Sequence, residues 1–435
     1  MTGERLRLFY SDVNAVERSK YLFPEDARTA RAAFCLTVFP LTLDREILQI
    51  PGYWFDVGAP DMEARVDPET MRLGWEGDGT IVAMADLTRD HEPVALDSRH
   101  ILRSAVKPWV DRGLIPQLAF EFEFYLMRRD DGGRWVSIDS PGSRVYGTGP
   151  SVDPDGVVED IVAAARASGF PVESYGSEFD DAQFEVNLHY DDAMGAADDA
   201  FLFRLLSKEV AHRHGVHATY LGRPFAERGG SGLHLNVSFR RADDGSNALY
   251  DPAEPDGLTP LARRCVAGML AHHEGAAAIC APTVNAYKRL VPDMLNGYWA
   301  NWGHDDRTVG IRISPDRGAA TRLENRVPDG SANPYLVAAA ELHACRFGVD
   351  AGLELQPEQP TFQEPNTSVR IPPSLDDALK AFEADRELCE ALGPDLVTAF
   401  TMLKRAEWDR YLKAGGDPGV TEPTDWELNY YLPFY

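Results

Sequence analysis

The sequence predicts an α+β protein with a small, strand-rich N-terminal domain and a larger domain in which strands and long helices alternate. From Leu6 to about Asp97 the apolar residues fall in short runs that suit strands, and no long helical pattern occurs. After Asp97, which suits a helix N-cap, apolar residues recur at helical spacing. The chain of 435 residues is long enough for two domains, which we expect at 1–98 and 99–435.

Most expected elements lie in the second domain. In the first domain, 34–38 and 81–85 are the clearest strands. In the second domain, aromatic and β-branched residues predict a strand at 118–127. Apolar periodicity predicts helices at 157–167, 200–214, 261–280, 335–349, 375–392 and 395–411.

Charge and composition limit the partners of the chain. Its formal net charge of −26 repels polyanions, and no cluster of Lys and Arg is interleaved with aromatics, so nucleic acid is not an expected partner. The apolar runs are short and interrupted by charge, and the N-terminus has no signal pattern, so neither a membrane span nor export is expected. The five cysteines lack C-x-x-C spacing, which suits reduced thiols. We therefore expect a soluble cytoplasmic protein.

Four predicted strands carry polar side chains on one face and apolar side chains on the other. Glu121 and Glu123 interrupt an aromatic strand two residues apart, so both carboxylates point to the same side. An edge strand with one wet face would explain any single case. The four cases together carry carboxylates, a histidine and arginines, which indicates one curved sheet whose concave face is a charged cavity. The three further stretches with this alternation are 183–189, 233–239 and 322–326.

The donor groups on these strands suit two hard divalent cations. Oxygen donors with one imidazole suit Mg²⁺ or Mn²⁺, and five carboxylates are more than one ion needs. Zinc is disfavoured because no cysteine takes part. The candidate metal ligands are Glu121, Glu123, Glu178, Glu185, His234 and Glu324.

Several arginines accompany these carboxylates. An arginine within a strand usually needs a carboxylate or phosphate partner. Divalent cations and arginines in a deep cavity are the equipment of phosphoryl transfer. Because neither a Walker A sequence nor a G-x-G-x-x-G loop occurs, a nucleotide must be held in another way. The arginines are Arg289, Arg307, Arg312, Arg322 and Arg326.

Through most of its length the chain resembles the glutamine synthetase family. The resemblance implies a small β-grasp N-terminal domain and a catalytic domain whose curved antiparallel sheet is flanked by helices. It also implies a homo-oligomer of stacked double rings, built from rings of five or six subunits, with active sites between neighbours. The stretches that carry it, in order, are EFEFYL (121–126), AQFEV (182–186), GGSGLH (229–234), NAYKRLVP (285–292), DRTVGIR (306–312) and RLENRVPDGSANPYL (322–336).

The resemblance implies a role for each candidate residue. The residues that resemble ligands of the first metal are Glu123, Glu178 and Glu185, and those of the second metal are Glu121, His234 and Glu324. Glutamate would be bound by Gly230, Arg289, Arg307 and Arg326. ATP would be bound by Asn236, Ser238, Arg312 and Arg322. The residues with an implied catalytic role are Glu121, Arg307 and Glu324.

The implied reaction consumes ATP and glutamate with two or more Mg²⁺ or Mn²⁺ ions. The γ-carboxylate of glutamate attacks the γ-phosphate of ATP, which gives γ-glutamyl phosphate and ADP. A nitrogen nucleophile then displaces phosphate. Activation is needed because a free carboxylate is a poor acyl donor, and closure of the site protects the acyl phosphate from water.

One departure from the family pattern concerns the nucleophile. Ammonia-using members carry a flap glutamate six residues after the arginine of the Lys-Arg-Leu motif, and that position is Leu295 here. Nearby Tyr298 and Trp299 can line an apolar pocket for a small organic amine, or can pack the loop or a subunit contact. The lost glutamate resembles the γ-glutamyl-amine ligase branch, so we expect an organic amine as the partner of glutamate.

Two further departures lie beside the expected site. The usual Gly-Pro-Gly-Gln is Asp180-Asp181-Ala182-Gln183, and the usual asparagine of Asn-Gly-Ser-Gly is Gly229. The two aspartates can attract a cationic amine or form a solvated turn. The missing asparagine side chain leaves glutamate less secure as the acid substrate.

Two other interpretations remain open. One is glutamine synthetase proper, in which another residue replaces the flap glutamate, and Asp56 is the candidate ammonium ligand. The other is a catalytically silent structural or regulatory relative. The retention of all six ligand positions and of the arginines argues against the silent relative.

Overall fold

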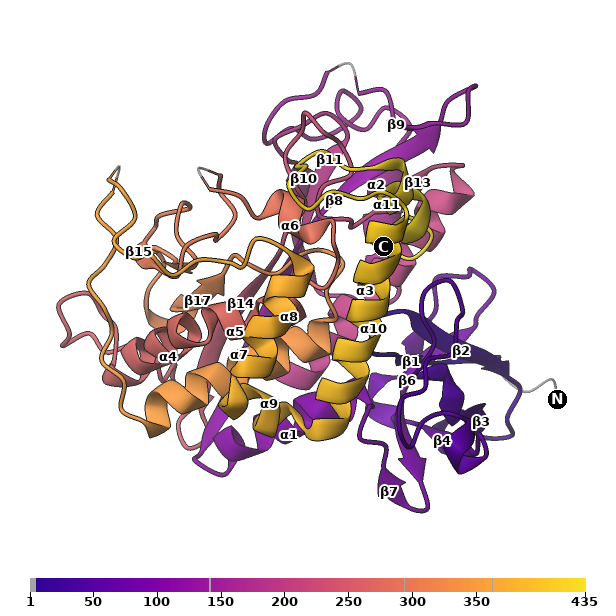
Figure 1. Cartoon of the computed structure of the whole chain (residues 1–435), viewed down its shortest axis with the longest axis horizontal. Helices are drawn as coiled ribbons and strands as arrows, with labels where there is room; N and C mark the ends of the chain where they lie inside the picture. The colour runs from indigo at the N-terminus through magenta and orange to yellow at the C-terminus, as the bar shows by residue number, and fades with distance from the viewer. Residues whose placement is uncertain (1–4, 141, 293, 362) are drawn as a thin grey trace.

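The structure is a computed structural model. It describes residues 5–435, with the exception of residues 141, 293 and 362. Its N-terminal part forms one β-sheet at one end of the molecule, and the rest forms a larger sheet with helices packed around it (Figure 1). This arrangement agrees with the predicted α+β class. Among the described residues, no helix combines the length and the apolar character that crossing a membrane requires.

The N-terminal sheet has the strand order β2-β1-β6-β4-β3, and β5 and β7 also pair with β6. All its pairs are antiparallel except β1 with β6. The prediction of a strand at 34–38 is only half right, because the chain leaves β3 after Cys35 and closes a 3₁₀ turn at Leu36–Val38. The strands are β1 (Leu6–Ser11), β2 (Glu17–Leu22), β3 (Arg31–Cys35), β4 (Asp61–Val66), β5 (Arg72–Leu73), β6 (Ile81–Arg89) and β7 (Glu92–Pro93).

A buried arginine ties the two parts of the chain together. Helix α1 (Ser98–Val110) begins after Asp97, whose side chain accepts a hydrogen bond from the Arg99 backbone N–H, as the N-cap prediction requires. The Arg99 side chain, only 2% exposed, donates to Asp198 at 2.8 Å and to Asp67 at 2.8 Å. Asp67 follows β4 of the small sheet, and Asp198 lies on α3 (Ala193–Arg213). The guanidinium therefore joins the small sheet to the helices of the larger part.

The larger sheet brings the four polar-faced strands side by side. Its order is β10-β11-β8-β14-β17-β16-β15, and β9, β12 and β13 also pair with β8. The neighbours β11, β8, β14 and β17 are the four predicted strands, so they do belong to one sheet. The strands are β8 (Leu114–Arg129), β9 (Trp135–Ser137), β10 (Val172–Ser177), β11 (Gln183–Leu188), β12 (Asp191–Asp192), β13 (His217–Thr219), β14 (Leu233–Arg241), β15 (Trp302–His304), β16 (Ile311–Ile313) and β17 (Leu323–Asn325).

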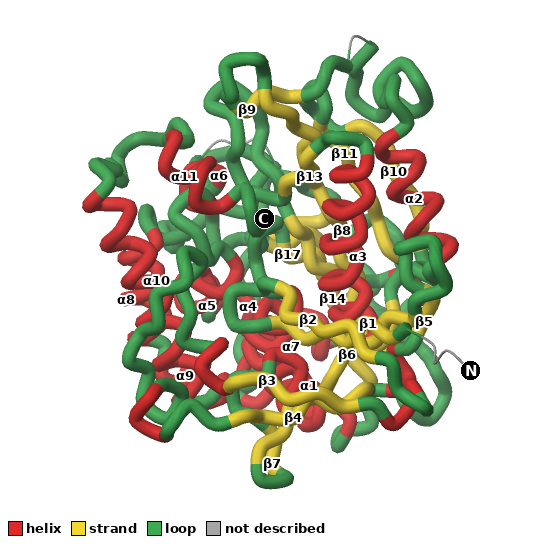
Figure 2. The backbone as a smooth tube through the Cα atoms, turned by 90° about the vertical axis from the view of Figure 1, so that its right-hand side faces the viewer, coloured by secondary structure: helices red, strands yellow, loops and turns green. Residues whose placement is uncertain are grey.

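The helices cover this sheet in two groups, seen from two directions in Figures 1 and 2. Helices α2 and α3 pack together, with α3 against β8. Helices α1, α4, α5 and α7–α10 form the second group, which α3 joins through its contacts with α1 and α7. Helix α2 matches its prediction, and α7 and α10 differ from theirs by one or two residues at each end. The remaining bounds are α2 (Val157–Ala167), α4 (Pro260–Ala271), α5 (His273–Cys280), α6 (Ala286–Arg289), α7 (Pro334–Asp350), α8 (Leu375–Ala384), α9 (Arg386–Leu392), α10 (Pro394–Lys413) and α11 (Asp425–Tyr431).

Three helix predictions need correction. The predicted helix 261–280 is interrupted at His272, and 375–392 is interrupted at Asp385. The Asp385 carboxylate caps α9 by accepting from the Leu388 backbone N–H, and it also lies 2.7 Å from His272 Nδ1. The two interruptions are therefore parts of one tertiary contact. The third helix, predicted from 200, begins earlier because the Asp192 side chain caps it at Met194.

Candidate active site

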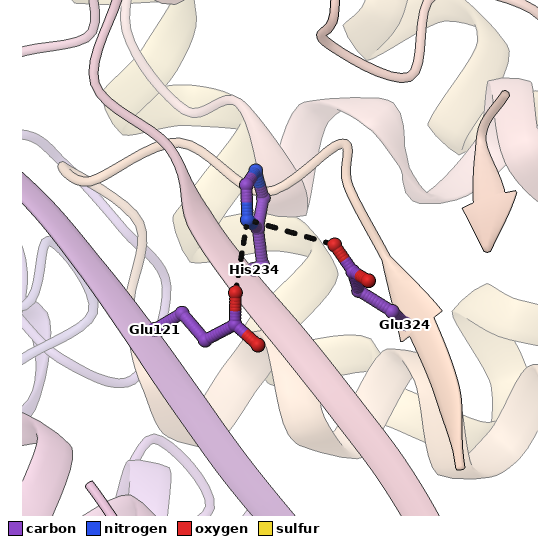
Figure 3. A group of neighbouring side chains, drawn as sticks. All are labelled: Glu121, His234 and Glu324. Atoms are coloured by element: carbon purple, nitrogen blue, oxygen red, sulfur yellow. Dashed lines mark hydrogen bonds and ion pairs between the residues drawn. The ribbon is translucent and has the colours of Figure 1, made fainter. Parts of the chain in front are cut away.

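Two clusters of potential ligands lie on the polar face of the larger sheet. In the first cluster, one ligand atom each from Glu121, His234 and Glu324 lies within 4.8 Å of the others. Figure 3 shows His234 on β14 between Glu121 on β8 and Glu324 on β17. Strand register produces this arrangement, because Glu121 pairs with His234 and Asn236 pairs with Glu324.

The second cluster contains Glu123, Glu178 and Glu185, whose ligand atoms also lie within 4.8 Å of one another. Glu123 and Glu185 face each other across β8 and β11. Glu178 comes from the turn after β10, and its backbone N–H donates to the Gln183 carbonyl at 2.9 Å. The two clusters adjoin, because His234 Nε2 lies 3.7 Å from Glu123 Oε1.

The electrostatics of the two clusters differ. Burial opposes ionisation of Glu121, but the hydrogen bond and charge of His234, with a hydrogen bond from Asn236, lower its pKa to about 2. In the second cluster, burial and then the charges of Glu123 and Glu185 raise the pKa of Glu178 to about 7. Three half-buried carboxylates that repel one another need a compensating cation. The donor set of oxygen atoms with one imidazole fits Mg²⁺ or Mn²⁺ in these clusters.

Two arginines hold the first cluster from one side. Arg312 donates to Glu324 Oε2 at 2.7 Å, and Arg326 donates to the other oxygen of the same carboxylate. Glu324 is only 2% exposed, so these charge-assisted hydrogen bonds replace water around it. Arg312 also bonds Asp305 at 2.6 Å. The geometry therefore places Arg312 and Arg326 at the same carboxylate.

The expected glutamate-binding residues are only partly brought together. Arg289 is buried and donates to the carbonyls of Val327 at 2.9 Å and Arg326 at 3.1 Å. Gly230 lies directly against it, because a Cβ added at Gly230 would come within 2.6 Å of Arg289 Cγ. Arg307 differs: it is exposed between β15 and β16, and its side chain forms no hydrogen bond or ion pair with the part of the chain that is described. The contribution of Arg307 to the site therefore stays a prediction.

A cavity of about 560 Å³ opens beside the first cluster. Its lining includes Glu121 and three of the four expected ATP-binding residues, Asn236, Ser238 and Arg322, whereas Arg312 is not among the lining residues. Asn236 connects two groups of the site, since its Nδ2 donates to Glu121 Oε1 at 2.7 Å and its Oδ1 accepts from Arg322 at 3.2 Å.

Tyr190 and Asn247 are among the lining residues of this cavity that sequence reasoning missed. Tyr190 is 53% exposed and stacks on His189 at the rim, with ring centroids 4.4 Å apart. Its only sequence signal is that it directly follows a polar-faced strand. Asn247 follows β14, forms an isolated β-bridge with Arg240 and donates to Ser238 Oγ at 3.0 Å. No sequence pattern marks Asn247.

The expected amine-pocket residues separate into three places. Leu295 is 58% exposed, and its carbonyl accepts from Arg326 at 3.3 Å, which places it next to the first cluster. Tyr298 is buried, its hydroxyl accepts from Arg370 at 3.0 Å, and it lines a separate cavity of about 130 Å³. Trp299 packs against the Tyr298 ring at 87°. Both rings pack against the loop in this structure, and their role in an amine pocket stays a prediction.

Asp56 lies apart from both clusters. It occupies an exposed 3₁₀ turn, Phe55–Val57, in the N-terminal part, and its carboxylate accepts from the Gly52 backbone N–H at 2.9 Å. Within one chain, Asp56 is not part of the site. Its role as an ammonium ligand stays a prediction that requires a second subunit.

Fold and site together define the class of the protein: an enzyme whose active site lies on a sheet that is antiparallel apart from the β15–β16 pair and that carries two clusters of potential metal ligands. The family model for the glutamine synthetase catalytic domain matches residues 95–431. The chain therefore belongs to the glutamine synthetase family. Members of this family are ATP-dependent and divalent-metal-dependent carbon–nitrogen ligases.

Relatives and solved structures agree with this assignment. The chain is 33% identical over 354 residues to a glutamine synthetase of Clostridium saccharobutylicum, with 80% of this chain and 78% of that protein covered. It is 32% identical over 418 residues to a glutamine synthetase of Methanocaldococcus jannaschii, covering 89% and 88%. A solved structure of GmaS without ligand matches with a TM-score of 0.81 and 29% identity, covering 99% and 97%. A complex of GmaS with ADP matches with a TM-score of 0.81 and 28% identity, covering 99% and 97%. These similarities confirm the predicted fold class and the family resemblance.

Proposed function

We propose that this protein is an ATP-dependent ligase that joins the γ-carboxylate of glutamate to an organic amine and releases ADP and phosphate. The observation that carries this proposal is the position of Leu295. Its carbonyl accepts from Arg326, which in turn donates to Glu324 of the first cluster. An exposed apolar side chain therefore lies where a carboxylate would attract and deprotonate ammonium. Leucine offers contact area to the alkyl part of an amine instead.

The similarity to GmaS supports the same choice. GmaS is a γ-glutamylmethylamide synthetase, a ligase that acts on an amine, and its structures align with 99% of this chain. The curated relatives favour a second candidate, glutamine synthetase itself, because they carry that name at 32–34% identity. The two candidates share every step except the nitrogen nucleophile.

The proposal gives each cluster a cation. Glu121, His234 and Glu324 would hold one Mg²⁺ or Mn²⁺, and Glu123, Glu178 and Glu185 would hold another. Such cations supply neutralisation of the charge that develops on phosphate and carboxylate oxygens. The four expected ATP-binding residues would hold the nucleotide, and Arg289, Arg326 and Gly230 would hold glutamate.

The chain's own residues would then orient two successive steps. The γ-carboxylate of glutamate attacks the γ-phosphorus of ATP, the bond to the β-phosphate oxygen breaks, and ADP leaves. The neutral amine next attacks the acyl carbon of γ-glutamyl phosphate, phosphate leaves, and one proton is lost from nitrogen. Arg307 would contact the phosphates from the exposed loop between β15 and β16.

We further propose that the protein assembles as stacked double rings with active sites between subunits. In such an assembly, the exposed turn that carries Asp56 can reach a neighbouring subunit's clusters. Analytical ultracentrifugation tests the assembly, since a species with the mass of one 48.2 kDa chain would contradict it.

The function is tested by phosphate release from ATP in the presence of Mg²⁺ and glutamate. Ammonium is compared with short alkyl amines, ethanolamine, polyamines and anilines. Strong release with one amine and little with ammonium is the expected result, and mass spectrometry of the γ-glutamylamide confirms the product. Strong release with ammonium alone would assign glutamine synthesis instead.

A further inference from the structure

We propose that Asp180 is a positioning residue that holds the glycine-rich loop 229–232 in place. Through this loop it would fix the position of Arg289, which would bind glutamate, and of Glu123 in the second cluster. The inference rests on the proposed function for the identity of the acid substrate. Asp180 lies in the turn between Glu178 and β11, outside both ligand clusters. Its role follows from its contacts with the loop.

The Asp180 carboxylate binds the loop at Gly229 through a hydrogen bond. Its Oδ2 accepts from the Gly229 backbone N–H at 2.5 Å and lies 3.1 Å from the Tyr125 hydroxyl. The same hydroxyl lies 2.9 Å from the Gly229 carbonyl, so its single proton can bond either acceptor. Gln183 also connects the turn to the loop. Its Nε2 donates to the Gly230 carbonyl at 3.0 Å, and its Oε1 accepts from the Asp180 backbone N–H at 3.3 Å.

Asp180 and Gly229 fit each other sterically. A Cβ added at Gly229 would lie 3.1 Å from Asp180 Oδ2, closer than ordinary van der Waals contact. A side chain at position 229 would therefore crowd the carboxylate. The aspartate in the turn and the glycine in the loop are both departures found in the sequence, and in space they form one contact.

The far side of the loop leaves little room for movement. Gly232 donates its backbone N–H to Glu123 Oε2 at 2.7 Å, within the second cluster. A Cβ at Gly230 would meet both Arg289 Cγ and the Gly222 carbonyl at 2.6 Å. A shift of the loop at Gly229 therefore changes the distance to Arg289 and to Glu123 together. Asp180 acts on glutamate binding through this displacement, without touching the substrate.

Asp181 provides a matched control. Its side chain is exposed and forms no hydrogen bond or ion pair with the described residues, although its carbonyl accepts from Arg228 at 2.6 Å. It carries the same charge as Asp180, one residue further along. A general effect of negative charge near the site would therefore appear in both variants, whereas the loop contact belongs to Asp180 alone.

The kinetic experiment compares Asp180→Ala, Asp180→Asn and Asp181→Ala in the full-length protein, after their melting temperatures and oligomer sizes have been measured. Asp180→Ala is expected to raise the KM for glutamate about tenfold or more, as loss of a charge-assisted hydrogen bond implies. The KM values for ATP and for the amine are expected to stay within about twofold. Asp180→Asn is expected to recover most of the loss, because its amide oxygen can still accept from Gly229. Asp181→Ala should match the wild type.

Hydrogen exchange gives a second readout that does not depend on the substrate. The peptide that contains 229–234 is expected to exchange faster in Asp180→Ala than in either Asp181→Ala or the wild type. Unchanged exchange and an unchanged KM for glutamate would overturn the proposal. A rise confined to the KM for the amine would also overturn it and would assign Asp180 to the amine. If the wild type uses neither amines nor ammonium with glutamate, the proposed function fails and the exchange result alone decides the role of Asp180.

Discussion

Arg312 donates to the carboxylate of Glu324 at 2.7 Å, so an arginine and a candidate metal ligand share one buried contact at the centre of the site. The oxygen that Arg312 binds belongs to the residue that also approaches His234 within 3.8 Å. The negative charge of Glu324 is thus needed by a histidine-containing cluster and by two guanidinium groups at once. Changing that charge tests the whole arrangement.

Replacing Glu324 by glutamine is expected to lower glutamate-dependent ATP turnover at least about a hundredfold, because the first cluster loses a carboxylate charge and the buried Arg326 loses its ion-pair partner. Phosphate release under saturating glutamate and amine measures this loss. The matched control is Glu390→Gln on α9, an exposed glutamate without an ion pair in the described part of the chain, which should leave turnover unchanged. Comparable turnover in the two variants would contradict the assignment of Glu324.

Divalent cations are expected to stabilise the folded protein, because the carboxylates of the second cluster repel one another. Binding to the native state at one hundred times Kd would contribute about 2.7 kcal/mol. Thermal melting with EDTA, Mg²⁺ or Mn²⁺ measures the effect, and the same series with Glu185→Gln should show a smaller shift. Equal melting temperatures with EDTA and with either cation would argue against the site.

Leu295→Glu is expected to raise the use of ammonium relative to organic amines, because it places a carboxylate beside Arg326 and the first cluster. A gain of about tenfold in kcat/KM for ammonium corresponds to about 1.4 kcal/mol. The control is Leu295→Gln, which has nearly the same shape without the charge. A similar change in both variants would show that size rather than charge at this position selects the nucleophile.

A pH-dependent contribution to stability is expected from Glu341 on α7. Burial, opposed by hydrogen bonds from Asn325 and Cys280, raises the pKa of Glu341 to about 7. The folded state therefore favours the protonated acid. The stabilisation that the protonated Glu341 side chain contributes to the folded state is complete below the ordinary pKa of the carboxyl. It is lost as the pH rises through about 7.

Glu341→Gln stays neutral and is expected to be more stable than the wild type at about pH 8, by on the order of 1–3 kcal/mol. The difference should shrink as the pH falls toward about 5.5. Urea unfolding across this range measures it, with Glu390→Gln as the exposed control. A difference of constant size at every pH would rule out the titration of Glu341 as the cause.

The polar strands were predictable because side chains alternate between the two faces of a strand, and this alternation is visible in the sequence. Glu121 and Glu123 share a face for that reason alone. The interruptions at His272 and Asp385 were not predictable, because each depends on a partner 113 residues away. Local periodicity carries no information about such a contact.

The same limit applies to the site. The ligand residues stand on regular strands or on a turn fixed by one, so their positions in the sequence give their positions in space. Tyr298 sits in a loop, where its partner Arg370 decides its direction, so the sequence pattern could not show which cavity the ring lines. Arg307 and Asp56 also lie outside the strands and are exposed, so strand periodicity does not predict where their side chains point.

Each cluster takes one carboxylate from strand β8, and these two residues alternate along the strand. Their separation sets the distance between the clusters. Glu121 belongs to the first cluster and Glu123 to the second, and two residues of a strand span about 6.6 Å. The backbone of β8 therefore fixes the distance between the clusters. Loops around the site can change in length or sequence without altering this spacing. One residue inserted between Glu121 and Glu123 would instead turn one carboxylate to the opposite face of the sheet.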